Sequence, residues 1–104
     1  MGNYRLSKFA ERDLAEILRY TIQTWGMEQG VAYLQLLTAA KNQIVNNPVL
    51  PGSKTRDDLA NGCRAFRVAK HLIFYRVSED SVEIARILHE SMDFSRHIGE
   101  ETFL

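Results

Sequence analysis

The chain has 104 residues, of which 45% are hydrophobic and 25% are charged. This length and composition are typical of one globular domain with a modest core, so we expect a single domain over residues 1–104. Thirteen basic residues balance thirteen acidic ones, which argues against a protein that holds nucleic acid by bulk electrostatic attraction.

The cysteine content and the hydropathy of the sequence indicate the expected cellular compartment. One cysteine, Cys63, excludes an intrachain disulfide and fits a reducing compartment. No apolar run approaches the roughly 20 residues of a membrane-spanning helix. The N-terminus also lacks the apolar stretch of a secretion signal. We therefore expect a cytoplasmic protein that does not associate with membranes.

The first quarter of the chain predicts a short strand and a helix. Residues 3–7 alternate apolar and polar side chains, as a strand does. Ser7 is a suitable N-cap for the helix that follows. Apolar side chains then recur at helical spacing as far as Trp25, and Gly26 is a good C-terminal stop. These signals predict a helix over residues 8–25.

A second helical stripe follows almost at once, from Ala32 to Ile44, and "NNP" at 46–48 ends it. The short connection predicts an antiparallel helical hairpin. Each apolar stripe is too wide to be buried by the other helix alone, so its large side chains are assigned to the core of the domain. The alternative is that some of these side chains contact a partner protein. For Trp25 a core position is favoured over an interface. The assigned side chains are Leu14, Leu18, Trp25, Tyr33 and Leu37.

The second half of the chain predicts a sheet. Residues 48–62 carry both prolines and predict a surface loop, with one helical turn at 57–60. β-branched and aromatic residues then predict strands over 63–69, 71–77 and 81–90, joined by short turns as an antiparallel meander. The tail from Ser91 predicts a single helical turn.

The element order β-α-α-β-β-β predicts an α+β fold. In this fold the helical hairpin packs on one face of a small antiparallel sheet, which the N-terminal strand joins. Strict alternation places Val82, Ile84, Arg86 and Leu88 on one face of the last strand. Both faces of that strand are mixed in polarity, which indicates a central strand.

Titratable side chains gather in "RILHESMDFSRHI", residues 86–98. The three histidines lack the spacing of a zinc site, and no nucleophile motif surrounds Cys63, so neither a metal, a cofactor nor a covalent nucleophile is predicted. RNA cleavage is the catalytic alternative, because the sheet could bring a base, an acid and a cation onto one face. The competing interpretation is that these side chains line a wet face or pair with carboxylates. The residues concerned are Arg64, Arg67, His71, Arg86 and His89.

Three stretches together resemble the ParE toxins of the RelE/ParE superfamily, in order and over nearly the whole chain. They are "YRLSKFAERDLAEILRYTIQTWG", "NGCRAFRVAKHLIFYRV" and "VEIARILHESMDFSRHI". Each motif is weak alone, but their combination at this length is specific. The markers are Tyr20, Thr21, Trp25 and Gly26; Gly62 and Arg64; His71 and Phe74 to Arg76; and Arg86 to His89 with Met92 and Asp93.

The resemblance implies the toxin of a type II toxin–antitoxin pair. Such toxins are held to inhibit DNA gyrase and so block replication, without enzymatic activity. A ParD-like antitoxin is expected to neutralise the toxin with a segment that folds on binding, which gives a hetero-oligomer. No sequence-specific nucleic-acid binding is expected of the toxin alone. The candidate partner-binding side chains are Arg64, Arg67, His71, Arg86, His89, Asp93 and Arg96.

Two alternatives share the same fold. One is a ribosome-dependent messenger endonuclease of the RelE type, in which Arg64, Arg86 and His89 would lie at comparable places. Against it, Asp57 and Asp58 would line an RNA channel poorly, and "LHESMD" resembles the gyrase-directed branch more closely. The other alternative is an inactive toxin-like interaction module.

Overall fold

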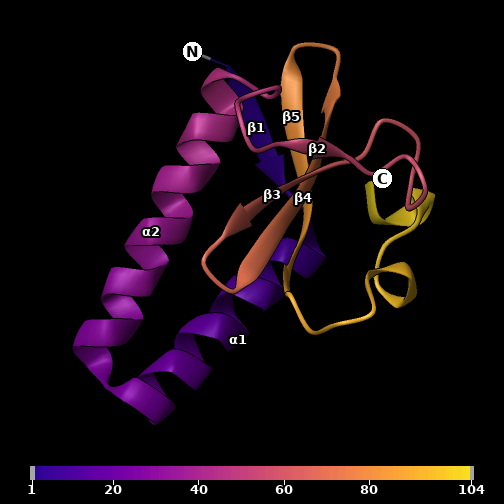
Figure 1. The fold of residues 1–104 in the computed structure, drawn as a ribbon. Coiled ribbons are helices and arrows are strands. Elements are labelled where there is room, and N and C mark those ends of the chain that lie inside the picture. The colour runs from indigo at the N-terminus through magenta and orange to yellow at the C-terminus, as the bar shows by residue number, and fades with distance from the viewer. Residues whose placement is uncertain (1, 104) are drawn as a thin grey trace.

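The chain folds into two helices and a sheet, which a computed structural model describes for residues 2–103. Figure 1 shows both long helices on one side of the sheet and the C-terminal segment on the other. The α+β class is confirmed, and the two predicted helices and four predicted strands are present in the predicted order, but β2 (Lys54–Thr55) is an additional strand and the C-terminal segment has two short 3-10 turns rather than the single turn predicted. Over residues 2–103 the elements are β1 (Asn3–Leu6), α1 (Lys8–Trp25), α2 (Met27–Asn46), β2 (Lys54–Thr55), β3 (Arg64–Val68), β4 (His71–Ser78), β5 (Ser81–His89), η1 (Phe94–Arg96) and η2 (Glu100–Phe103).

The helical hairpin follows the local signals closely. The Ser7 side chain caps α1 by accepting a 2.9 Å hydrogen bond from the Ala10 N–H. Gly26 ends α1 with φ 98°, and its N–H donates to the Ile22 carbonyl at 2.8 Å. Gly26 alone separates the two helices, so α2 begins five residues before its apolar stripe became visible at Ala32. Neither helix has the length and hydropathy to cross a membrane, as judged over residues 2–103.

The sheet has the strand order β1-β5-β4-β3-β2. The meander β3-β4-β5 is antiparallel as predicted, but β1 pairs with β5 in parallel. The prediction of a purely antiparallel sheet is therefore wrong. The alternation of apolar and polar residues predicts that a segment is a strand, but not whether it pairs in parallel or antiparallel with a strand remote in the sequence. Strand β2 was not predicted, because two residues are too few to show the alternation of apolar and polar side chains that marks a strand. The predicted helical turn at 57–60 is a set of hydrogen-bonded turns instead.

A β-bulge changes the faces of β5. Phe74 lies opposite Arg86, whereas Tyr75 lies opposite Ile84, so Ala85 is the extra residue of β5. The alternation of side chains shifts by one at this point. Ile84 therefore packs on the helical side and Leu88 on the other side, so the predicted common face of Val82, Ile84, Arg86 and Leu88 is wrong. The central position of β5, between β1 and β4, is as predicted.

Both faces of the sheet are buried. The helical side joins Leu37 and Ile44 of α2 to Ile73 and Tyr75 of β4. The opposite side is covered by the loop before β3 and by the C-terminal segment, which contributes Phe103. The described part of the chain thus forms a three-layer arrangement of helices, sheet and irregular segments, in which the sheet belongs to both cores.

Candidate functional site

The arginines predicted to share a face do not converge. Arg64 and Arg67 lie three residues apart on a regular strand and so point to opposite faces. Arg64 Nε donates to Ser53 Oγ at 2.8 Å, and Arg67 forms an ion pair with Glu90 at the other end of β3. Arg86 pairs with α1 instead. These three cations therefore contact three different parts of the molecule rather than one shared site.

Arg86 holds α1 and the C-terminal segment to β5. Its Nε and Nη2 each donate to the Asp13 carboxylate at 2.9 Å, and the Ile87 N–H donates to the same carboxylate at 2.9 Å. Arg86 Nη1 also donates to the His97 carbonyl at 3.3 Å. Asp13 is only 8% exposed, and its pairing with Arg86 was not predicted from the sequence. The sequence feature that could have indicated a buried ion pair is the position of Asp13: it lies three residues after Ala10, on the apolar stripe of α1.

The predicted core stripe of the hairpin divides into buried and exposed parts. Leu37 is fully buried, Leu14 and Tyr33 pack against the core, and Leu18 is half-buried. Trp25 is 69% exposed, so its favoured assignment to the core is wrong. The reason is geometric, since the hairpin extends past the sheet and its turn has nothing to cover it (Figure 1).

A groove of about 730 Å³ lies between this end of the hairpin and the sheet. Its apolar wall is built by exposed side chains of both helices, and its floor by polar side chains at the ends of β4 and β5. Contiguous exposed apolar surface of this kind is typical of a binding site for another protein. The wall includes Tyr20, Trp25 and Leu36, and the floor includes Lys70, His71 and His89.

Tyr33 of α2 contacts one of the two histidines in the floor of the groove. Tyr33 Oη lies 2.6 Å from His71 Nδ1. His71 and His89 are cross-strand partners whose ring centroids lie 5.3 Å apart. Burial lowers the pKa of His71, and the neighbouring His89 lowers it further. Burial also raises the pKa of Tyr33. Of the predicted residues, the structure thus brings together His71 and His89 but places Arg64, Arg67 and Arg86 elsewhere.

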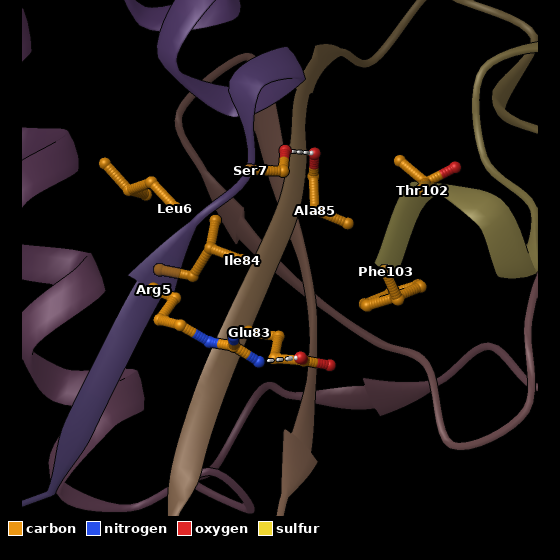
Figure 2. Close-up of a pocket in the computed structure, with 8 residues that line it drawn as sticks. All are labelled: Arg5, Leu6, Ser7, Glu83, Ile84, Ala85, Thr102 and Phe103. Atoms are coloured by element: carbon orange, nitrogen blue, oxygen red, sulfur yellow. Dashed lines mark hydrogen bonds and ion pairs between the residues drawn. The ribbon is translucent and has the colours of Figure 1, made fainter.

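A second, smaller hollow of about 110 Å³ lies where β1, β5 and η2 meet (Figure 2). Its polar groups are already engaged: Ser7 Oγ donates to the Ala85 carbonyl at 2.6 Å, and Arg5 pairs with Glu83. Figure 2 shows Arg5 of β1, and Ser7 just after β1, joined to β5, with Phe103 beside them. This hollow is therefore a junction between elements of the fold.

The remaining predicted residues lie at the surface or in the core. Asp93 and Arg96 are exposed and lie 3.7 Å apart at the start of the C-terminal segment. Cys63 is fully buried, which raises the pKa of its thiol to about 12 and disfavours the reactive thiolate. Across residues 2–103, no three His, Cys, Asp or Glu side chains gather as the ligands of a metal ion would.

Comparison with known proteins identifies the family. A family model described as the ParE toxin of the type II toxin–antitoxin system parDE matches residues 4–94. Toxin ParE1 of Caulobacter vibrioides is 38% identical over 95% of this chain and 100% of its own length. Toxin ParE1 of Mycobacterium tuberculosis is 33% identical over 93% of this chain and 98% of its own length.

Solved structures share the fold. A chain of the chromosomal ParDE toxin–antitoxin system from P. aeruginosa superposes with a TM-score of 0.75 at 16% identity, covering 86% of this chain and 96% of that one. A chain of the toxin–antitoxin complex RelBE2 from Mycobacterium tuberculosis gives a TM-score of 0.58 at 21% identity, covering 85% and 96%. The family match over residues 4–94 and the ParE1 relatives lead to one conclusion: this chain belongs to the ParE toxin family of type II toxin–antitoxin systems.

Proposed function

We propose that this chain is a cytoplasmic toxin that blocks replication by binding DNA gyrase, and that it does so without catalysis. The observation that carries the proposal is the family match over residues 4–94. The separation of Arg64, Arg67 and Arg86 supports the absence of catalysis. A phosphoryl-transfer site needs cations aimed together at the developing charge, and each of these arginines is held in a contact of its own.

The groove beside the hairpin is the proposed docking site of a ParD-like antitoxin. Its wall exposes large apolar side chains, including Trp25 at 69% and Tyr20 at 65% exposure. Its lining contains Lys70 and two histidines but no carboxylate, so its charge favours an acidic occupant. An amphipathic helix that lays an apolar face into a groove is a common mode of peptide recognition. The P. aeruginosa relative comes from a ParDE system, which supports a partner of this kind.

Replacing the exposed indole tests the docking site. We expect Trp25→Ala to weaken antitoxin binding by at least 2 kcal/mol, about 30-fold in Kd, because exposed tryptophans are frequent anchors of interfaces. Val49→Ala is a matched control, since Val49 is 68% exposed and lies outside the groove lining. Calorimetry on the purified pair measures both. Equal affinity of Trp25→Ala and wild-type protein would place the antitoxin elsewhere.

The gyrase proposal is tested with purified components. Gyrase, relaxed plasmid and ATP are incubated with the toxin, and the products are separated before and after protein removal. We expect supercoiling to fall and cleaved DNA to accumulate, and equimolar antitoxin to reverse both effects. Unchanged supercoiling at a large excess of folded toxin would contradict the proposal.

RNA cleavage is kept as a second candidate because of one contact. The 2.6 Å separation of Tyr33 Oη and His71 Nδ1 is the kind of pair that moves a proton in acid–base catalysis, and Lys70 is nearby in the same groove. This candidate predicts cleaved messages when the toxin is added to translating ribosomes, and no cleavage by His71→Ala. Intact messages in the presence of active toxin would exclude it.

A further inference from the structure

The Tyr33–His71 pair can take up one proton without losing a hydrogen bond. Tyr33 Oη lies 2.6 Å from His71 Nδ1 and 3.4 Å from the Val68 carbonyl oxygen. When the imidazole is neutral, the Tyr33 hydroxyl donates to Nδ1. When the imidazole is charged, its Nδ1–H donates to Tyr33 Oη, and the hydroxyl proton turns to the Val68 carbonyl. Both protonation states of His71 are therefore accommodated by the same three groups.

The surroundings of His71 supply little negative charge. From β5 it faces His89, whose Nδ1 accepts a 3.1 Å hydrogen bond from the Ser91 N–H. From α2 it faces Tyr33, and Tyr20 of α1 lines the same groove. The turn before β4 contributes Lys70.

The two carboxylates that act on the pKa of His71 already have cationic partners. Glu90 is paired with Arg67, and Asp13 of α1 is paired with Arg86. Both raise the pKa of His71, but burial and His89 outweigh them, so the pKa is lowered in the isolated protein. The lowered pKa favours the neutral imidazole of His71, and the ring borders a groove whose lining contains no acid.

We propose, building on the docking site assigned above, that the antitoxin segment in this groove sets an apolar side chain against Trp25 and a carboxylate over His71, so that complex formation takes up one proton. Charge complementarity favours this occupant, because the floor of the groove carries the cation of Lys70 and the lining has no carboxylate to oppose it. The Tyr33 hydroxyl stabilises the charged ring by accepting its Nδ1 proton. A carboxylate facing the groove supplies the counter-charge that the free toxin lacks.

The sign of the pH dependence follows from this arrangement. A neighbouring carboxylate favours the imidazolium, so His71 holds its proton at a higher pH in the complex than in the free toxin. By linkage, the antitoxin binds more tightly as the pH falls. Uptake of a single proton limits the change in Kd to about tenfold per pH unit, within the range from about pH 8 to pH 6 in which histidines titrate.

Calorimetry with the purified cognate antitoxin tests the proposal. Titrations at about pH 6, 7 and 8 in buffers of different ionisation enthalpy count the protons taken up. We expect up to one proton per wild-type complex and a Kd three- to tenfold lower at the acidic end. His71→Asn keeps a polar atom near the position of Nδ1 but does not titrate, so it should abolish the proton uptake and flatten the dependence of Kd on pH, whatever its effect on the affinity at a single pH. His97→Asn is the control, because the hydrogen bonds given for His97 come from its backbone: the carbonyl accepts from Arg86 and the N–H donates to the Phe94 carbonyl.

A second measurement does not depend on the variant. NMR titration of the His71 ring in the wild-type protein should show its pKa rising when the antitoxin binds. Binding without proton uptake, equal pH dependence in His71→Asn, or an unchanged pKa would overturn the proposal. The docking site would still stand if Trp25→Ala weakened binding. Absence of binding at every pH would overturn both.

Discussion

At the scale of single residues, the Asp13–Arg86 pair decides how α1 meets the sheet. The carboxylate accepts three hydrogen bonds, two from the guanidinium and one from the Ile87 N–H. Side-chain exposure is 10% for Asp13 and 15% for Arg86, so water compensates neither charge well. A buried pair of this kind adds little net stability when intact, but it is costly to break. Its main effect is to fix the position of α1 against the bulged segment of β5.

Asp13→Ala tests that role. The substitution leaves the Arg86 guanidinium and the Ile87 N–H in a poorly hydrated site without their acceptor. We expect the free energy of unfolding to fall by about 3 kcal/mol, as measured by urea denaturation. Asp93→Ala is the control, because its pair with Arg96 is exposed, and exposed pairs contribute about 1 kcal/mol or less. Similar losses in the two variants would contradict the assigned role of Asp13.

His71 also affects stability in the absence of a partner. Its pKa is lowered in the folded protein, so the unfolded chain binds more protons as the pH falls below the ordinary histidine value of about 6.5. Stability is then lost as the pH decreases through that value towards the folded pKa. We expect His71→Asn to lose less stability than wild-type protein between about pH 7.5 and 5.5, by urea denaturation at each pH. Parallel profiles for the two proteins would contradict this assignment.

At the scale of elements, the two helices pack tightly against each other near their connection. A Cβ added at Gly30 would lie 2.5 Å from Ile22 Cγ1, which is shorter than a carbon–carbon contact can be. Gly30 therefore permits α2 to pack against α1 directly after the turn at Gly26. This packing lies next to Trp25 and Tyr33, which line the groove.

A double-mutant cycle tests this close approach. We expect Gly30→Ala to destabilise the protein by about 1–2 kcal/mol, because the clash exceeds the gain in helix propensity. In an Ile22→Ala background the clashing atom is absent, so the same substitution should be neutral or stabilising. The coupling energy from urea denaturation should be about 1 kcal/mol or more. Additive effects of the two substitutions would show that the helices do not meet at this point.

The elements also show what the sequence could predict. Helix α1 was predicted to the residue because its cap, stripe and stop are all local signals. The bulge in β5 was not, since Ala85 gives no local sign that the alternation shifts there. Parallel pairing of β1 with β5 depends on how remote elements dock. Trp25 was misassigned for a related reason, because a helical stripe reveals which side is apolar but not how far the sheet beneath it extends.

At the scale of the whole molecule, a hydrophobic core packs on each face of the single sheet, whereas the end of the helical hairpin near Trp25 is not covered by the sheet. The helical side of the sheet and the side beneath the C-terminal segment are both buried. The exposed apolar surface near Trp25 and Leu36 is therefore available to a partner without any loss of core packing. The family was recognisable from the sequence because its motifs lie on β1, α1, the β3-β4-β5 meander and the start of the C-terminal segment. The groove was not, since it forms only where α1, α2 and the ends of β4 and β5 meet.

The central claim is that this toxin acts by binding gyrase and not by turnover. The most direct measurement is gyrase supercoiling activity as a function of the molar ratio of toxin to gyrase, with cleaved DNA and RNA integrity followed in parallel. A binding mechanism predicts inhibition that saturates near a stoichiometric ratio, accumulates cleaved DNA and leaves RNA intact. Full supercoiling activity at a large excess of folded toxin, with or without RNA cleavage, would contradict the claim.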